Sequence, residues 1–78
     1  MARKIHEIAS EILQDWKKPY FGAIPYIEAM LQLNTIHDDY YLDTAESVVI
    51  YFLATAQTWR GETAKRIKAE LREMLKEV

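Results

Sequence analysis

The sequence contains no cysteine, only two glycines and two prolines, and no long hydrophobic run. Without cysteine, the chain has no disulfide bond, no thiolate metal site and no cysteine nucleophile. Because its glycines stand alone at positions 22 and 61, it has no glycine-rich phosphate-binding loop. The longest apolar run, residues 48–54, is far shorter than the stretch of about 20 residues that spans a bilayer. We therefore expect no membrane span.

The 78 residues suffice for one domain, so we expect residues 1–78 to form a single helical unit. Half of the residues are apolar and 28% are charged, which is typical of a folded globular protein. The formal net charge of −2 is too small to mark a nucleic-acid binder. The first seven residues lack the apolar core of a signal peptide, and we therefore expect a cytoplasmic protein.

Apolar residues recur at three- and four-residue spacing in several segments, which predicts helices. We expect the first helix from about Ala2 to Lys17, where Pro19 prevents its continuation. After a short connector, Pro25 suits the first turn of a second helix, and Asn34 is the expected C-terminal cap of that helix.

A third helix is expected over residues 45–58, with Asp43 and Glu46 as its capping box. Its apolar segment, residues 48–53, also suits a strand, but the cap before it and the helix formers after it favour a helix. Because this helix is apolar on nearly all sides, we expect it to lie at the centre of the molecule. The helical spacing of apolar residues in the third helix nearly continues beyond Gly61. The last helix is therefore either separate or part of one long helix that bends at this glycine.

The predicted fold class is therefore all-α, a compact bundle of three to four helices with a central apolar helix at about residues 44–58. So small a domain without disulfides depends on tight packing of its apolar side chains. The expected core residues are Ile8, Ile12, Trp16, Ile27, Met30, Val49, Phe52, Leu53, Ala56, Ile67 and Leu71.

Charge is distributed unevenly, since no lysine or arginine occurs between positions 19 and 59. That stretch carries five acidic residues and no base, whereas residues 1–18 have four bases and three acids, and residues 60–78 have six bases and four acids. One interpretation is that the middle of the chain forms core and connectors, which carry few charges. The other is that its acidic, tyrosine-bearing loop contacts a basic partner, because tyrosine is enriched at binding hot spots.

Two clusters combine aromatic residues with turn residues, one around Gly22 and one before Gly61. Their rings can close the ends of the helix bundle, or they can form a hot spot for a protein partner, where Trp, Tyr and Arg dominate. Together with the acidic loop, these clusters supply the candidate partner-binding residues Tyr20, Phe21, Tyr26, Asp38, Asp39, Tyr40, Tyr41, Trp59 and Arg60.

Other chemistry has little support in the sequence. His37 and the nearby Asp38, Asp39 and Asp43 are metal-ligand types, but their spacing fits neither a zinc site nor a calcium loop. No serine lies in a nucleophile motif. We expect no catalytic residue, no metal and no other cofactor, and we predict that the protein is not an enzyme.

The last helix carries a basic stripe that consists of Lys65, Lys68, Arg72 and Lys76. Acidic residues run beside it, with Glu62 and Arg66 as an expected pair, and this mixture is typical of a solvated face. A DNA-contacting helix in a helix-turn-helix arrangement is the alternative, although nucleic acid is not the partner that we expect.

Five short motifs occur together along the chain: Asp15-Trp16-Lys17, Tyr20-Phe21-Gly22-Ala23, Pro25-Tyr26, Tyr51-Phe52-Leu53 and Thr58-Trp59-Arg60-Gly61-Glu62-Thr63-Ala64. In this combination, which covers nearly the whole length, the chain resembles a group of small proteins encoded by prophages and conjugative transposons of Gram-positive bacteria. The group has no established activity, so the resemblance implies no functional residue. It implies a cytoplasmic bacterial setting and an accessory role in a mobile element. Lys18-Pro19 departs from the usual pattern, which leaves the first connector undefined.

We therefore predict a non-enzymatic binding or accessory protein that acts through protein–protein contacts. A small DNA-associated regulator that uses the last helix is the alternative function. We also expect self-association as a homodimer, because a short chain with nine aromatic residues gains stability by covering some of them.

Overall fold

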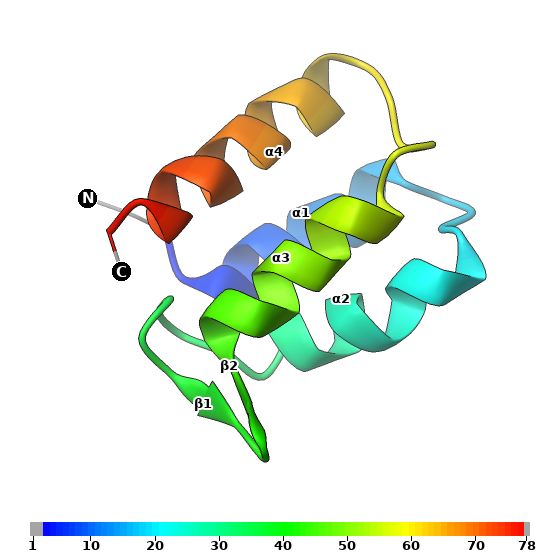
Figure 1. The fold of residues 1–78 in the computed structure, drawn as a ribbon. Coiled ribbons are helices and arrows are strands. Elements are labelled where there is room, and N and C mark those ends of the chain that lie inside the picture. The colour runs from blue at the N-terminus through cyan, green and yellow to red at the C-terminus, as the bar shows by residue number, and fades with distance from the viewer. Residues whose placement is uncertain (1–2, 78) are drawn as a thin grey trace.

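The computed structural model describes residues 3–77. Within this range four α-helices form a bundle, and a small two-stranded hairpin extends from it (Figure 1). The predicted all-α fold class is confirmed. In chain order, the elements are α1 (Ile5–Asp15), the 3-10 turn η1 (Phe21–Ala23), α2 (Ile24–Met30), β1 (Asp39–Tyr40), β2 (Asp43–Thr44), α3 (Ala45–Thr55) and α4 (Glu62–Leu75).

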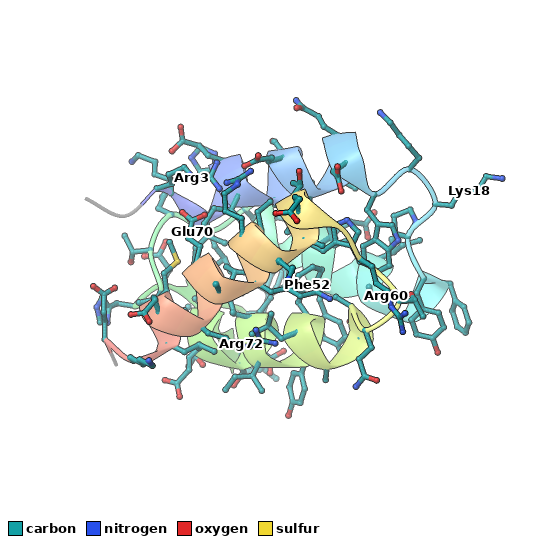
Figure 2. All side chains as sticks on the ribbon, turned by 90° about the horizontal axis from the view of Figure 1, so that it is seen from above. Arg3, Lys18, Phe52, Arg60, Glu70 and Arg72 are labelled. Atoms are coloured by element: carbon teal, nitrogen blue, oxygen red, sulfur yellow. The ribbon has the colours of Figure 1, made fainter. Side chains whose placement is uncertain are left out.

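The core lies between the four helices, and none of the polar or charged residues among 3–77 is buried in it. Phe52 of α3 is fully buried, and Figure 2 shows it between the helices. The predicted core residues are buried with one exception, Leu53, which is partly buried and packs against the others. The sequence pattern missed several buried residues, including Ile5, Leu33, Ile36, Val48 and Trp59.

α1 is shorter than predicted, although its apolar face is buried as expected. The predicted start, Ala2, lies outside the described residues. The helix ends at Asp15, well before Pro19, because Trp16 leaves the helical conformation with φ −92° and ψ 88°. Trp16 turns its ring into the core, so a tertiary contact ends the helix before the proline does.

α2 begins at Ile24 with Pro25 in its first turn, as predicted. It ends at Met30, so the prediction that Asn34 caps this helix was wrong. The Asn34 carbonyl instead accepts a hydrogen bond of 2.9 Å from the Ile5 N–H. This bond satisfies an N–H at the start of α1 and joins that helix to the segment after α2.

The start of α3 differs from the prediction because of the hairpin. The N-cap is Thr44, whose hydroxyl oxygen accepts a hydrogen bond of 3.1 Å from the Ser47 N–H. Asp43 was predicted to be the cap, and this was wrong, because Asp43 pairs with Tyr40 in the antiparallel hairpin. Strands of two residues are too short to show an alternating pattern, so they could not be predicted from the sequence.

α3 ends at Thr55 rather than Thr58, and one of its faces is open to solvent. Ile50 is 46% exposed and Tyr51 is 52% exposed, whereas Phe52 points into the core. The apolar segment is a helix, as predicted, but the other helices do not enclose it on all sides. A chain of this length has too few elements to surround one helix completely.

α3 and α4 are separate helices, so the alternative of one long helix bent at Gly61 is wrong. Gly61 stands immediately before α4 with a φ of +116°, which residues that carry a Cβ rarely adopt. Figure 1 shows α4 running back along the bundle after this turn. It contacts both α1 and α3 and closes the core.

Candidate functional site

The tip of the hairpin holds the two most exposed large apolar side chains among residues 3–77. Tyr41 is 85% exposed and Leu42 is 102% exposed. Figure 1 shows the hairpin extending away from the helices at the end where α3 begins. Tyr41 has a φ of +55°, which is unfavourable for a residue with a large side chain. Exposed apolar surface and backbone strain are both concentrated at binding sites in proteins.

The base of the hairpin is acidic and aromatic. Tyr40 is partly buried, packs against the core, and places its ring edge-on to that of Tyr41 with 4.7 Å between the ring centroids. Asp39 and Asp43 are exposed on the two strands. Because no lysine or arginine lies between positions 19 and 59, no base from the same stretch of chain offsets these carboxylates.

Asp38, just before the hairpin, has a structural role. Its carboxylate accepts hydrogen bonds from the N–H groups of Asn34 at 2.8 Å and Thr35 at 3.2 Å, and from the Thr35 hydroxyl at 3.1 Å. These bonds, above all that from Asn34, hold the pKa of Asp38 below its ordinary value of 3.8. Its carbonyl also accepts a 2.8 Å bond from Ala45. Asp38 therefore positions the hairpin on α3, whereas the exposed Asp39 carboxylate accepts no hydrogen bond from residues 3–77.

A hollow of about 280 Å³ lies between α2, the hairpin and α3. Tyr26, Tyr40 and Tyr51 line it, and the ring centroids of Tyr26 and Tyr51 are 5.7 Å apart. Glu28 and Asp43 add two carboxylates from two different elements. The fold thus brings together the predicted residues Tyr26 and Tyr40. Sequence reasoning missed the other three, because they meet only when the hairpin folds against both helices.

The rest of the first aromatic cluster, Tyr20 and Phe21, lies elsewhere. Tyr20 and Phe21 are 47% and 76% exposed, and their ring centroids are 4.9 Å apart. Tyr20 lines a second hollow at the C-terminal end of α3, together with Ala54, Thr55, Gln57 and Thr58. Since α3 has 11 residues and each adds about 1.5 Å, roughly 16 Å of helix separates this cluster from the hairpin. Tyr20 and Phe21 therefore do not share a surface with the hairpin, whereas Tyr26 of the same cluster does.

The fold divides the second aromatic cluster. Trp59 is 3% exposed, and its ring stacks on that of Trp16 with 5.7 Å between centroids and 12° between planes. Its indole N–H donates a 2.8 Å hydrogen bond to the Asp15 carboxylate. Trp59 is therefore a core residue that joins α1 to the α3–α4 connection, and it offers no surface to a partner. Arg60 is exposed at the outer end of the bundle (Figure 2).

The basic stripe of α4 is interrupted at Lys68. The Lys68 ammonium donates a 2.7 Å hydrogen bond to the Trp59 carbonyl and lies 5.9 Å from the centroid of the Trp59 ring. Burial lowers the pKa of Lys68, and the nearby charges of Arg72 and Arg60 lower it further. This lysine therefore serves the packing of α4 on the α3–α4 connection.

Four charged residues connect α1 with α4. The Arg3 guanidinium donates to Glu70 at 2.7 and 3.0 Å and to Glu11 at 2.7 Å, and Arg66 also donates to Glu11. Figure 2 shows Arg3 and Glu70 on the same side of the bundle. The Glu70 hydrogen bonds, with a smaller contribution from Glu11, raise the pKa of Arg3, whereas the bonds from Arg66 and Arg3 lower that of Glu11. Among residues 3–77 Arg66 pairs with Glu11, so the expected pair with Glu62 was wrong.

Across residues 3–77, no three His, Asp or Glu side chains come together as a metal site would require, and this includes His37 and its acidic neighbours. None of the helices in that range combines the length and the hydropathy needed to cross a bilayer. Comparison with models of protein families, with curated proteins and with solved structures found no match for the chain.

Proposed function

We propose that the chain is a non-enzymatic accessory protein that binds a protein partner through its hairpin. The binding face consists of Tyr26, Asp39, Tyr40, Tyr41 and Leu42. The observation that carries the proposal is the hairpin tip, where two large apolar side chains are held in water and one of them has an unfavourable φ. Such an arrangement reduces the stability of the free protein, and contact with a partner offsets that loss.

The charge of the face indicates the chemistry of the partner. Carboxylates flank the tip, and the stretch of chain that forms the face contributes no base. A basic partner surface would associate faster with this face, and the opposite charges would fix its orientation. Tyrosines supply contact area at low cost in side-chain entropy, so they suit the centre of such an interface. We therefore expect a basic partner with an apolar recess for Leu42.

The setting of this binding activity comes from the sequence resemblance. It supports a cytoplasmic accessory role in a mobile element of a Gram-positive bacterium. The alternative of a DNA-associated regulator remains a prediction without a specific contact in its favour, and a gel-shift assay at low salt tests it. Self-association also remains a prediction, which sedimentation equilibrium tests.

Affinity capture with matched variants tests the proposed function. The protein and its Leu42→Ser, Asp39→Lys and Glu73→Lys variants would be immobilised and exposed to lysate of Gram-positive cells that carry the gene. Glu73→Lys is the control, because it reverses an exposed charge on α4 rather than on the hairpin. Quantitative mass spectrometry would compare the retained proteins.

We expect a protein that the wild type and the control retain equally and that Leu42→Ser and Asp39→Lys retain about tenfold less, as for residues at a hot spot. The melting temperatures of the variants should stay close to that of the wild type, because both altered side chains are exposed. Equal retention by all four proteins would contradict the proposal.

A further inference from the structure

We infer that the hollow between α2, the hairpin and α3 binds a single arginine side chain of the protein partner. This inference rests on the proposed protein-binding function and assigns the chemistry of one anchor within it. Five side chains carry the inference, three aromatic and two acidic, and they come from α2, the two strands of the hairpin and α3. These side chains are Tyr26, Tyr40, Tyr51, Glu28 and Asp43.

The size of the hollow fits one side chain. Its volume of about 280 Å³ lies at or below the lower end of the range of roughly 300–1,000 Å³ that is typical of small-molecule sites. Pro25, Ala29 and Val48 complete the lining and provide apolar contacts for the methylene groups of a long side chain.

The aromatic lining favours a cation. A cation within about 6 Å of a tyrosine ring centroid is attracted by the negative face of the ring, and the attraction grows when water is excluded. Tyr26 and Tyr51 place two rings 5.7 Å apart at an angle of 37°. Tyr26 is partly buried and Tyr51 is 52% exposed, so neither ring is enclosed by the fold.

The two carboxylates favour a cation as well, and they exclude a purely apolar occupant. Glu28 and Asp43 are exposed, and within residues 3–77 neither pairs with a base. Of the residues from 3 to 77, no lysine or arginine lines the hollow. An apolar group placed there would remove water from both carboxylates without giving them a partner, which is unfavourable.

The arrangement favours guanidinium over ammonium. Glu28 is on α2 and Asp43 is on β2, so the acceptors enter the hollow from different elements. A guanidinium has five N–H donors in one plane, and that plane also stacks on aromatic rings. An ammonium is a compact, strongly hydrated point charge and gains less from flat rings.

A nuclear magnetic resonance titration of the isotope-labelled chain tests the site with three small probes. These are N-acetyl-arginine amide, N-acetyl-lysine amide and N-acetyl-citrulline amide, the last of which has nearly the shape of arginine without its charge. We expect the arginine probe to cause saturable shifts of the ring signals of Tyr26, Tyr40 and Tyr51. The other two probes should bind about tenfold more weakly.

Charge-removing variants complete the test. The Glu28→Gln/Asp43→Asn double variant should lose the arginine-dependent shifts, whereas Glu73→Gln on α4 should keep them. Both changes affect exposed side chains, and unchanged backbone spectra would show that the fold is intact. The inference is overturned if arginine causes no shifts, if citrulline or lysine binds equally well, or if the double variant still binds.

The outcome is distinguishable from a failure of the proposed function. Capture that depends on Leu42, together with no arginine binding, would refute the arginine site and leave the protein-binding function in place. Arginine binding without Leu42-dependent capture would support the site and contradict the hairpin face. Loss of both would refute both.

Discussion

Tyr41 combines an unfavourable backbone conformation with an exposed side chain, and both lower the stability of the folded protein. Its backbone has a φ of +55°, and its side chain is 85% exposed, so little in the folded molecule compensates for the strain. Among residues 3–77, its one aromatic contact is with its neighbour Tyr40. A residue selected for stability at this turn would be glycine or asparagine, which tolerate a positive φ. A tyrosine at this position agrees with the proposed role of the hairpin tip in binding a partner.

Tyr41→Gly should raise the free energy of unfolding by about 0.5–1 kcal/mol, because relief of strain exceeds the entropy cost of glycine. Urea denaturation measures this change. Leu42→Gly is the control, since Leu42 has no positive φ, and it should not stabilise the protein. We expect Tyr41→Gly to weaken partner capture at the same time. A lower stability of Tyr41→Gly than of the wild type would contradict the assignment of strain to this residue.

Asp38 predicts a pH dependence of stability. Its pKa is lower in the folded protein than its ordinary value of 3.8, so its charged form stabilises the fold above that pH. The contribution is lost as the pH falls through the folded pKa. We therefore expect Asp38→Ala to be less stable than the wild type at neutral pH, with a difference that shrinks below about pH 3.8. Thermal melts across this pH range measure the difference.

Asp39→Ala is the control for this prediction, because the Asp39 carboxylate is exposed and accepts no hydrogen bond from residues 3–77. Its melting temperature should follow that of the wild type at every pH. A difference between Asp38→Ala and the wild type that does not change with pH would contradict the role given to the Asp38 carboxylate.

At the scale of elements, spacing predicts where helices form, and tertiary contacts decide where they end. The apolar spacing in α1 and α4 is sufficient to identify both helices. The end of α1 is set by Trp16, which stacks on Trp59 far along the chain, and no local pattern contains that information. The N-cap of α3 is Thr44 and not the predicted Asp43, because Asp43 belongs to a strand of the hairpin.

The candidate site was predictable only in part for the same reason. Charge and composition identified the acidic, aromatic loop with Tyr40 and Tyr41, because an uneven distribution of charge can be read directly from the sequence. The hollow was not predictable, since Tyr51 is one residue of an apolar helix and Glu28 is one exposed acid. Trp59 was ambiguous for a different reason, because large aromatic residues are common both in cores and at interfaces.

Gly61 separates α3 from α4, and this role is testable. Its φ of +116° is strained for any residue with a Cβ, so Gly61→Ala should reduce the free energy of unfolding by about 1–3 kcal/mol. Gly22→Ala is the matched control. A Cβ at position 22 would lie 2.6 Å from a ring atom of Tyr20, but that ring is 47% exposed and can move. If denaturation shows that Gly61→Ala costs no more than Gly22→Ala, the turn does not depend on this φ.

At the scale of the whole molecule, the charges are divided between two tasks. Arg3, Arg66 and Lys68 make contacts within the fold, where they join α1, α4 and the α3–α4 connection. The acids of the middle stretch have no bases beside them in sequence, and the hairpin carries Asp39 and Asp43 into solvent. The bases near the two ends of the chain thus stabilise the fold, and under the proposed function the acidic, aromatic middle of the chain contacts the partner.

Site-specific photo-crosslinking tests the central claim most directly. A photoreactive residue would replace Leu42 at the hairpin tip or, as the control, the exposed Lys65 on α4, and intact bacterial cells would be irradiated. We predict a covalent adduct with a protein from position 42 and not from position 65, and we predict that Asp39→Lys abolishes it. The same adducts from both positions, an adduct from position 65 alone, or none at all would contradict the claim that a protein partner binds at the hairpin.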